Sequence, residues 1–478
     1  MTVEAVGRKT KIICTVGPAS SDPDTLGKMI EAGMDAARIN TGHCEDTGQM
    51  RRYISAVEEA SAETGRRVGL MLDLQGPRLR VGKMAGPGAE LREGEEFTIT
   101  TDDVEGDSGR VSVAYQRLSI ELKPGDCVLM DDGLIRLVVK AVSGPEVLCE
   151  VREGGYLREG KGLNFPGAAL GLPSFTGRDR LFLEEGLRAG AEWVAQSFVR
   201  GADDVRELRE AIEALGHRVP IMAKIEKREA VDGIDSVLEE AQGVMVARGD
   251  LGVEMSAEEV PLVQKEIIRK SMRAAKPVVT ATQMLESMVG HSRPTRAEAS
   301  DVANAILDGT DAVMLSAETA VGSYPVKTVE TMRRIADKTE QALDYARLLE
   351  ERGRWSHRGT AEAIGYAACK IAADLGAGAI ITVTRGGSTA RLIARYRPRA
   401  RIIAVSPDEE VIDGMSVVWG VEGLMAPLAE GLKETVEGVV GECKRGGLVE
   451  AGDLVVITGG FLDERAGMTN TITVRTVE

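Results

Sequence analysis

Eight short apolar segments in the first two thirds of this 478-residue chain constrain its fold more than any other feature. Each has the length and apolar character of a buried β-strand, and helical stretches alternate with the strands. Parallel strands that alternate with helices predict an α/β fold, a (β/α)8 TIM barrel. The predicted strands are Lys11–Val16, Ala36–Asn40, Val68–Asp73, Trp193–Phe198, Ile221–Glu226, Val244–Arg248, Val278–Thr282 and Val313–Ser316. The predicted helices are Asp24–Glu31, Asp46–Glu63, Arg178–Arg188, Asp203–Ala214, Ala257–Ala275, Ala297–Leu307 and a last one from Pro325 towards Glu351.

The alternation is interrupted between Asp73 and Leu172, where short strands are separated by Gly- and Pro-rich turns. This pattern is typical of an antiparallel β-module. Because it follows the third barrel strand, we expect a small β-barrel cap that closes over a substrate at the mouth of the (β/α)8 barrel and excludes water. Its predicted strands are Glu96–Thr100, Val111–Tyr115, Cys127–Met130, Ile135–Val142 and Val147–Arg152.

A polar stretch at residues 350–360 marks the start of a last unit, with a helix near Ala361–Ala373. Strands are predicted at Ile380–Thr384, Ile402–Val405, Leu454–Thr458 and Thr471–Val477. The sequence therefore predicts three domains: the barrel at 1–74 and 173–350, an inserted β cap domain at 75–172, and a C-terminal α/β domain at 351–478. The first strand of the last domain opens into a loop before a helix, which is a candidate phosphate cradle.

The composition excludes several classes of protein. A net charge of −16 argues against a nucleic-acid-binding surface. The six cysteines are scattered without a CxxC pair, which indicates free thiols in a reducing compartment and neither a disulfide framework nor a zinc site. No apolar stretch approaches a membrane span. We expect a cytoplasmic protein with neither a nucleic-acid nor a membrane partner.

Charged residues stand at the C-terminal ends of two predicted strands, the ends that form the mouth of a parallel barrel. Lys224 and Glu226 are two residues apart and share one face of a strand, and Asp250 follows the next strand. A lysine with two carboxylates suits Mg²⁺ (or Mn²⁺) and a phosphorylated or otherwise anionic substrate. The alternative is a structural Lys–Glu pair at the barrel rim.

Other strand ends carry further candidates. Arg38 could clamp a phosphate or pair with a barrel carboxylate. Thr282, Ser316 and Glu318 could relay a proton, or each could cap a helix. The backbone N–H groups of Gly249 and Asp250 could hold a carboxylate, unless this segment is a plain turn that leads to a helix capped by Ser256.

Several motifs resemble those of pyruvate kinases, and the resemblance covers essentially the whole chain. These motifs are Lys11–Ser20, Met222–Glu226, Val246–Gly252, Ala281–Met288, Arg293–Glu298, Ser300–Ala305, Met314–Thr319, Asn164–Gly167, Arg395–Pro398 and Thr469–Thr471. The resemblance implies phosphoryl transfer from phosphoenolpyruvate to ADP, followed by protonation of enolpyruvate to pyruvate, as the last step of glycolysis. It also implies a homotetramer.

The resemblance assigns roles residue by residue. Lys224 matches the lysine that neutralises the phosphoryl group in flight, and Arg38 matches the phosphate-binding arginine. Glu226 and Asp250 match the Mg²⁺ ligands.

Other matches concern the rest of the substrates. Gly249, Asp250 and Thr282 match the groups that hold the substrate carboxylate. Thr282, Ser316 and Glu318 lie where the family is thought to deliver the proton. The positions near the nucleotide are matched by Asn40, His43 and Arg80.

The chain departs from the family at its potassium site. Gly42 and Leu74 replace two hydroxyl ligands of K⁺, and Arg78 replaces a glutamate. Since guanidinium is always charged, we expect Arg78 to substitute for K⁺ and the enzyme to work without it. The alternative is a weakened site that persists through Asn40 and Asp73.

Two nearby departures remove positive charge: Gln75 stands in place of a family lysine, and Gly201 in place of a nucleotide-contacting lysine.

The loop of the last domain resembles the phosphate-binding loop of the family's effector domain, with an altered pattern. An effector could therefore be a sugar phosphate or a nucleotide, or be absent. The candidate effector residues are Thr384, Arg385, Gly386, Gly387, Ser388 and Thr389.

Two other functions remain open at this point. One is a Mg²⁺-dependent lyase of the aldolase type that acts on pyruvate enolate. The other is a non-catalytic regulator that binds a phosphorylated metabolite.

Overall fold

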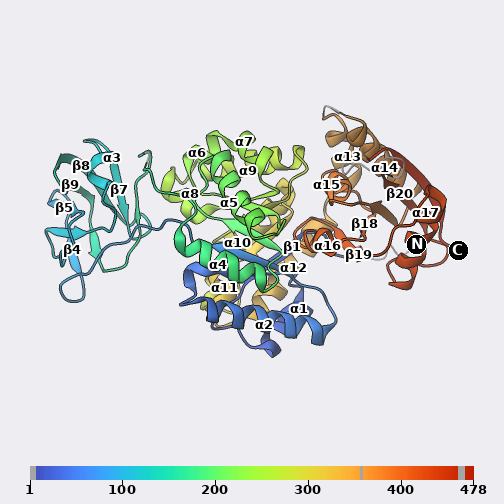
Figure 1. Cartoon of the computed structure of the whole chain (residues 1–478), viewed down its shortest axis with the longest axis horizontal. Helices are drawn as coiled ribbons and strands as arrows, with labels where there is room; N and C mark the ends of the chain where they lie inside the picture. The colour runs from blue at the N-terminus through green and yellow to red at the C-terminus, as the bar shows by residue number, and fades with distance from the viewer. Residues whose placement is uncertain (1–6, 169, 356–358, 461–468) are drawn as a thin grey trace.

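Three groups of elements follow one another along the long axis of the molecule (Figure 1). The computed structural model describes residues 7–168, 170–355, 359–460 and 469–478. A β-rich unit lies at one end, a barrel surrounded by helices lies in the middle, and an α/β unit lies at the other end.

The central unit is a closed barrel of eight strands, in the order β1-β16-β15-β14-β13-β12-β3-β2. Every neighbouring pair is parallel. The predicted (β/α)8 barrel is therefore confirmed. Its strands are β1 (Lys11–Thr15), β2 (Ala36–Asn40), β3 (Gly69–Leu74), β12 (Trp193–Gln196), β13 (Ile221–Ile225), β14 (Gly243–Ala247), β15 (Val278–Ala281) and β16 (Ala312–Leu315).

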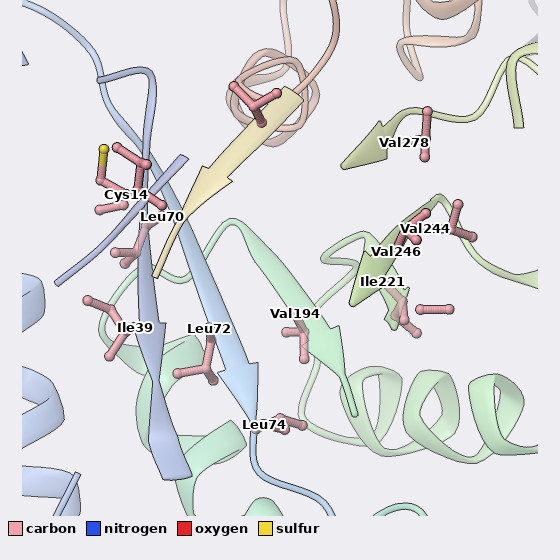
Figure 2. Packing of buried hydrophobic residues seen from close by; sticks show 14 of the residues in the cluster. Cys14, Ile39, Leu70, Leu72, Leu74, Val194, Ile221, Val244, Val246 and Val278 are labelled. Carbon is pink, nitrogen blue, oxygen red and sulfur yellow. The ribbon is translucent and has the colours of Figure 1, made fainter. Parts of the chain in front are cut away.

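Alternation along each strand separates two apolar layers. In β13, Ile221, Ala223 and Ile225 belong to the layer between strands and helices, whereas Met222 belongs to the barrel interior. Figure 2 shows the outer layer, with side chains from neighbouring strands directed towards the helices. The same alternation directs Lys224 to the interior, because it lies two residues beyond Met222.

The main helices around the barrel are α1 (Pro23–Ala32), α2 (Thr47–Thr64), α4 (Gly177–Arg188), α5 (Ala202–Ala214), α7 (Ile234–Glu240), α9 (Val260–Arg273), α10 (Arg296–Asp308) and α12 (Pro325–Gln341). Short helices α6 (Arg228–Asp232), α8 (Arg248–Glu254) and α11 (Ala317–Ala320) follow strands β13, β14 and β16.

Two helix predictions were wrong in detail. The segment after β14 is helix α8, and the following helix begins at Val260, so Ser256 does not cap it. The helix from Pro325 ends at Gln341, and α13 (Tyr345–Gly353) starts anew because the Asp344 side chain accepts a hydrogen bond from the Arg347 amide.

The β-rich unit contains a six-stranded sheet in the order β11-β7-β8-β9-β5-β6 and a two-stranded sheet β10-β4. Its pairs are antiparallel except β5 with β6. The strands are β4 (Ala89–Leu91), β5 (Glu96–Thr100), β6 (Arg110–Ser112), β7 (Cys127–Met130), β8 (Ile135–Ser143), β9 (Glu146–Glu153), β10 (Gly155–Leu157) and β11 (Leu163–Asn164), with helix α3 (Leu118–Glu121). It has a separate apolar core around Phe97, Val128 and Leu137.

The C-terminal unit is a five-stranded sheet in the order β19-β18-β17-β20-β21, in which only β21 is antiparallel. It comprises α14 (Thr360–Leu375), β17 (Ala379–Val383), α15 (Ser388–Ala394), β18 (Arg401–Ser406), α16 (Glu409–Asp413), β19 (Val421–Met425), α17 (Leu432–Arg445), β20 (Leu454–Gly459) and β21 (Thr471–Thr476). Sequence reasoning missed β19. Val417 of this unit belongs to the apolar cluster of the barrel interior, so the two units pack directly.

Within the ranges that the structure describes, no helix is long and apolar enough to cross a membrane.

Candidate active site

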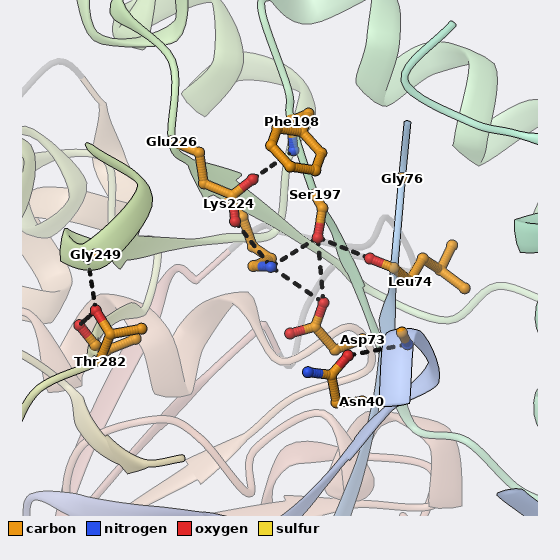
Figure 3. Close-up of polar contacts among 12 residues, drawn as sticks. Asn40, Asp73, Leu74, Gly76, Ser197, Phe198, Lys224, Glu226, Gly249 and Thr282 are labelled. Atoms are coloured by element: carbon orange, nitrogen blue, oxygen red, sulfur yellow. Dashed lines mark hydrogen bonds and ion pairs between the residues drawn. The ribbon is translucent and has the colours of Figure 1, made fainter. Parts of the chain in front are cut away.

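The site centres on the ammonium group of Lys224, at the C-terminal end of β13. Lys224 Nζ lies 2.8 Å from Glu226 Oε1 and 3.3 Å from Asp73 Oδ1, and it donates a hydrogen bond of 2.6 Å to Ser197 Oγ. Figure 3 shows these three contacts converging on the ammonium group. The residue is only 8% exposed. Burial opposes the charge, but Asp73 and Glu226 raise the pKa of Lys224 to about 12.

Asp73 joins this lysine to a second buried cation. Arg38 Nε donates a hydrogen bond of 2.6 Å to Asp73 Oδ2, and its Nη1 donates one of 2.9 Å to Thr15 Oγ1. Burial disfavours the charged carboxylate, yet Arg38 and Lys224 hold the pKa of Asp73 below its usual value. Arg38 thus pairs with a barrel carboxylate, as one reading of the sequence allowed, and it lies beside Lys224.

Glu226 is buried with two partners. Its Oε1 pairs with Lys224, and its Oε2 accepts a hydrogen bond of 2.7 Å from the Phe198 amide. Burial raises the pKa of Glu226 to about 7, and the nearby Asp250 charge adds to this effect while Lys224 opposes it. Two carboxylates close enough to repel each other are a favourable place for a divalent cation.

The donor set suits Mg²⁺. No group of three His, Cys, Asp or Glu residues that could hold a metal occurs among the described residues. The site instead has two carboxylates, those of Glu226 and Asp250. This number fits Mg²⁺, which commonly binds one or two protein carboxylates and completes its coordination with water and substrate oxygens.

The ends of β14 and β15 are tied together by Thr282. Its Oγ1 accepts a hydrogen bond of 2.9 Å from the Gly249 amide and donates one of 2.7 Å to the Ala281 carbonyl. Thr282 and Gln283 have φ angles of 65° and 53°, in the left-handed region that side chains rarely adopt. Arg248 holds this strained turn, because its guanidinium donates to the Thr282 carbonyl and pairs with Asp301 at 2.6 Å.

Ser316 and Glu318 lie at the end of β16. The Glu318 carboxylate accepts hydrogen bonds from the backbone amides of Ser316 at 2.7 Å and Leu285 at 3.1 Å. It is therefore a buried acceptor that fixes two loops. The Ser316 hydroxyl is buried and has no hydrogen-bond partner within the described part of the chain. Of the two, Ser316 has the group that is free to meet a ligand.

Asn40, His43 and Arg80 lie at the edge of this centre. Asn40 Oδ1 accepts a hydrogen bond of 3.1 Å from the Gly42 amide and so caps the short 3-10 helix Thr41–His43. Burial, with the nearby cations Arg38, Arg78 and Arg80, lowers the pKa of His43. Arg80 Nη1 donates to the Gly160 carbonyl at 2.8 Å.

Arg78 does not lie against Asp73. Its guanidinium is 3.5 Å from Asp132 Oδ1 of the β-rich unit, whereas the Asp73 carboxylate is paired with Arg38 and Lys224. Arg78 lines a cavity between this unit and the barrel mouth, together with Asp250 and Phe165. The β-rich unit therefore borders the mouth, and Arg78 lies between the two.

Sequence reasoning missed Ser197 and Thr15. Ser197 Oγ accepts from Lys224 and donates a hydrogen bond of 2.7 Å to the Leu74 carbonyl. Its only signal was its place at the end of the fourth predicted strand. Thr15 is the last residue of β1, so its place at a strand end could also have marked it as a site residue.

The candidate effector loop lies in the C-terminal unit, in front of α15. Gly387 precedes the helix with a φ angle of 74°, which favours glycine. Thr389 Oγ1 lies 2.8 Å from Thr469 Oγ1, and Arg391 Nη2 donates to the Gly386 carbonyl at 2.9 Å.

A (β/α)8 barrel that gathers paired cations and carboxylates at its mouth, beside a β-rich unit, is the arrangement of an enzyme that acts on a small anionic molecule. The family models of the barrel domain and the alpha/beta domain of pyruvate kinase match residues 7–329 and 362–475. The chain therefore belongs to the pyruvate kinase family.

Individual relatives agree. The chain is 47% identical over 473 residues to a pyruvate kinase of Geobacillus stearothermophilus, covering 98% of this chain and 80% of that protein. It is 42% identical to a pyruvate kinase of Clostridium acetobutylicum, covering 98% and 100%. The crystal structure of a pyruvate kinase from Cryptosporidium parvum has a TM-score of 0.92 at 36% identity, covering 98% of this chain and 96% of that one.

Proposed function

We propose that this enzyme transfers the phosphoryl group of phosphoenolpyruvate to ADP, giving ATP and pyruvate. The observation that carries the proposal is the buried, charged Lys224 ammonium beside Asp73, Glu226 and Ser197 at the barrel mouth. A fixed cation there stabilises the negative charge of a phosphoryl group in transit without solvent rearrangement.

The phosphate of the substrate would meet Arg38 and Lys224, which lie on either side of Asp73. The substrate carboxylate would accept hydrogen bonds from the backbone N–H groups of Gly249 and Asp250 and from the Thr282 hydroxyl. In that arrangement the Gly249 amide, which now donates to Thr282 Oγ1, would turn to the substrate and release the threonine hydroxyl.

Glu226 and Asp250 would hold Mg²⁺ (or Mn²⁺), because a divalent cation between the two carboxylates would remove the repulsion between their charges. When bound, the cation neutralises charge on the substrate oxygens and orients them. The two carboxylates fix where the substrate can lie.

Protonation of enolpyruvate would use the end of the barrel that carries Thr282 and Ser316. The Ser316 hydroxyl supports this role because it is buried without a partner in the described chain, while Glu318 holds the loop that presents it. Asn40, His43 and Arg80 would contact the nucleotide at the cap side.

We further propose that K⁺ is not required. Gly42 and Leu74 provide no hydroxyl ligands. The Asp73 charge is balanced by Arg38 and Lys224. In this proposal Arg78 supplies the fixed cation when its exposed pairing with Asp132 gives way to substrate.

A steady-state assay of pyruvate release from phosphoenolpyruvate tests these proposals. We expect release to depend on ADP and Mg²⁺, with less than a twofold change when K⁺ replaces tetramethylammonium at constant ionic strength. Release without ADP would indicate hydrolysis of phosphoenolpyruvate in place of phosphoryl transfer. Without any release, binding of phosphoenolpyruvate would favour a regulator, and C–C cleavage that yields pyruvate would favour a lyase. A large stimulation by K⁺ would contradict K⁺ independence alone.

At the level of the whole protein, we propose a cytoplasmic homotetramer that acts in the last step of glycolysis. Its domains would be 1–74 with 173–350, 75–172 and 351–478. The loop Thr384–Thr389 would bind a phosphorylated effector. Activation by such an effector should be lost in a Ser388→Ala/Thr389→Ala variant, and unchanged activation would place the effector site elsewhere.

A further inference from the structure

A cleft of about 750 Å³ lies where the barrel meets the C-terminal unit. Helices α7 and α9 form its barrel side, and residues around Trp355 and the end of α15 form the other side. Figure 1 shows α9 on one side of this junction, with α13 and α15 on the other. The end of α9 leads into the start of β15, so the cleft lies at the end of the barrel opposite Lys224.

Cationic side chains dominate the lining. Five are present, against three carboxylates. The cations are Arg269, Lys270, Arg273, Arg354 and Arg395. Since the whole chain carries a net charge of −16, this excess of positive charge is opposite to the average of the molecule.

Some of these cations are paired, and two are not. Lys270 lies 2.7 Å from Asp235, and Arg395 lies 3.2 Å from Glu362. Within the described ranges, neither Arg273 nor Arg354 has a carboxylate within 4.0 Å, although both line the cleft. Two such guanidinium groups on opposite walls are a suitable fork for an anion.

One more cation, Arg352, lies next to the lining residues Arg273 and Arg395. The guanidinium groups of Arg273, Arg352 and Arg395 surround the Trp355 ring at 5.8, 5.9 and 5.9 Å from its centroid. Arg352 is 5% exposed and donates to the Arg395 carbonyl, with no carboxylate at ion-pair distance among the described residues. Burial and Arg397 lower the pKa of Arg352 to about 9. Buried arginines are normally paired, so Arg352 lacks the carboxylate that such a position favours.

Arg395 also has a buried donor atom without an acceptor. The residue is 4% exposed, and its Nε has no hydrogen-bond acceptor in the described part of the chain. An anion in the cleft would lower the electrostatic cost of the buried charges of Arg352 and Arg395.

We propose that this cleft binds a phosphorylated metabolite, with Arg273 and Arg354 holding its phosphate group from the barrel side and the C-terminal side. The volume lies within the range of small-molecule sites. The site is separate from the loop Thr384–Thr389, because that loop precedes α15 whereas Arg395 follows its last turn. The ligand would bridge the two units and so would favour one relative placement of them.

Titration calorimetry with inorganic pyrophosphate tests the proposal. The full chain is titrated at fixed ionic strength and without the divalent metal that the active site is proposed to use. We expect saturable binding that includes one site per chain weakened at least about tenfold by Arg273→Ala and by Arg354→Ala. Arg354 forms no ion pair with a described residue, so its removal leaves the fold intact, which the unfolding midpoint checks.

Two controls locate the binding. Arg92→Ala removes an exposed cation from the β-rich unit, and Ser388→Ala/Thr389→Ala alters the effector loop. At the site that the Arg273 and Arg354 variants weaken, both controls should bind pyrophosphate within about twofold of the unmodified chain. The proposal is overturned if saturable binding is absent, if the Arg273 and Arg354 variants both bind normally, or if the loop variant loses the site that these two variants weaken.

Discussion

Lys224 keeps its charge in a nearly dry position because three groups surround its ammonium. Two are the carboxylates of Asp73 and Glu226, and the third is the Ser197 hydroxyl. Each of its three N–H donors therefore has an acceptor, and the rotamer is fixed before a substrate arrives. This arrangement is the preorganised charge that phosphoryl transfer needs.

Ser197 should act as a positioning residue. In Ser197→Ala the ammonium loses one acceptor, and the Leu74 carbonyl loses a donor. We expect kcat to fall about tenfold and KM for phosphoenolpyruvate to change less. Ser197→Thr, which retains the hydroxyl, should recover most of the rate. Equal kcat values for the alanine variant and the unmodified enzyme would show that Ser197 does not position Lys224.

Glu192, away from the site, gives the stability a dependence on pH. Burial raises its pKa to about 7, with Arg67 opposing and Glu409 adding to the effect. The folded state then holds a proton that the unfolded state has already released between pH 4.5 and 7. The contribution of Glu192 is therefore full below its unfolded pKa and is lost as the pH rises through about 7.

Thermal unfolding at pH 5.5 and pH 8 measures this contribution. The unmodified chain should lose more stability over this interval than Glu192→Gln, by on the order of 1 kcal/mol. The same loss in both proteins would assign the pH dependence to other groups.

At the scale of elements, the site depends on strand ends and the short helices that follow them. Alternation along β13 could be read from the sequence, so the inward direction of Lys224 and Glu226 was predictable. The pairing of Asp73 with both Arg38 and Lys224 was not, because it depends on barrel registers such as Asn40 with Asp73 and Ala195 with Asp73. The helical state of Arg248–Glu254 was missed because two glycines in seven residues favour a turn.

Gly17 shows how tightly two of these strand-end loops approach each other. A β-carbon at this position would lie 2.6 Å from the Ala320 carbonyl oxygen in α11. The Gly17→Ala change should therefore displace the α11 loop, which carries Glu318, and destabilise the protein by roughly 1–3 kcal/mol. Activity should fall as well.

A second glycine provides the control for this prediction. Gly438 lies inside α17, and a β-carbon added there would have no neighbouring atom within 4 Å, so Gly438→Ala should stabilise the chain by about 0.5–1 kcal/mol. A Gly17→Ala variant with normal stability and activity would show that the α11 loop moves freely.

At the scale of the whole molecule, the barrel could be predicted because eight apolar segments recur with helices between them. The β-rich unit and the C-terminal unit could be recognised because the regular alternation of barrel strands and helices is interrupted there. Strand β19 could not be predicted from the sequence. It lies at the edge of the sheet, and only its first residue is buried, so it lacks the apolar pattern of a central strand. The packing of Val417 into the barrel interior joins residues far apart in the chain, and no local pattern indicates such a contact.

Lys9 joins the barrel to the C-terminal unit. Its Nζ donates hydrogen bonds to the carbonyl oxygens of Pro398, Arg399 and Ala400 at 2.7, 2.7 and 2.8 Å, and it lies 4.9 Å from the centre of the Trp419 ring. Lys9→Met leaves these carbonyls without the donor. We expect the free energy of unfolding to fall by about 3 kcal/mol, seen as a first unfolding transition at lower temperature.

Lys327→Met removes an exposed lysine of α12 and should leave that transition unchanged. If the Lys9 and Lys327 variants unfold alike, the junction does not depend on Lys9.

The most direct test of the proposed chemistry is the kcat for phosphoryl transfer from phosphoenolpyruvate to ADP in Lys224→Met. If the Lys224 charge stabilises the phosphoryl group in transit, kcat should fall by about a thousandfold or more while phosphoenolpyruvate binding is largely retained. A kcat within about tenfold of the unmodified enzyme would contradict this role for Lys224.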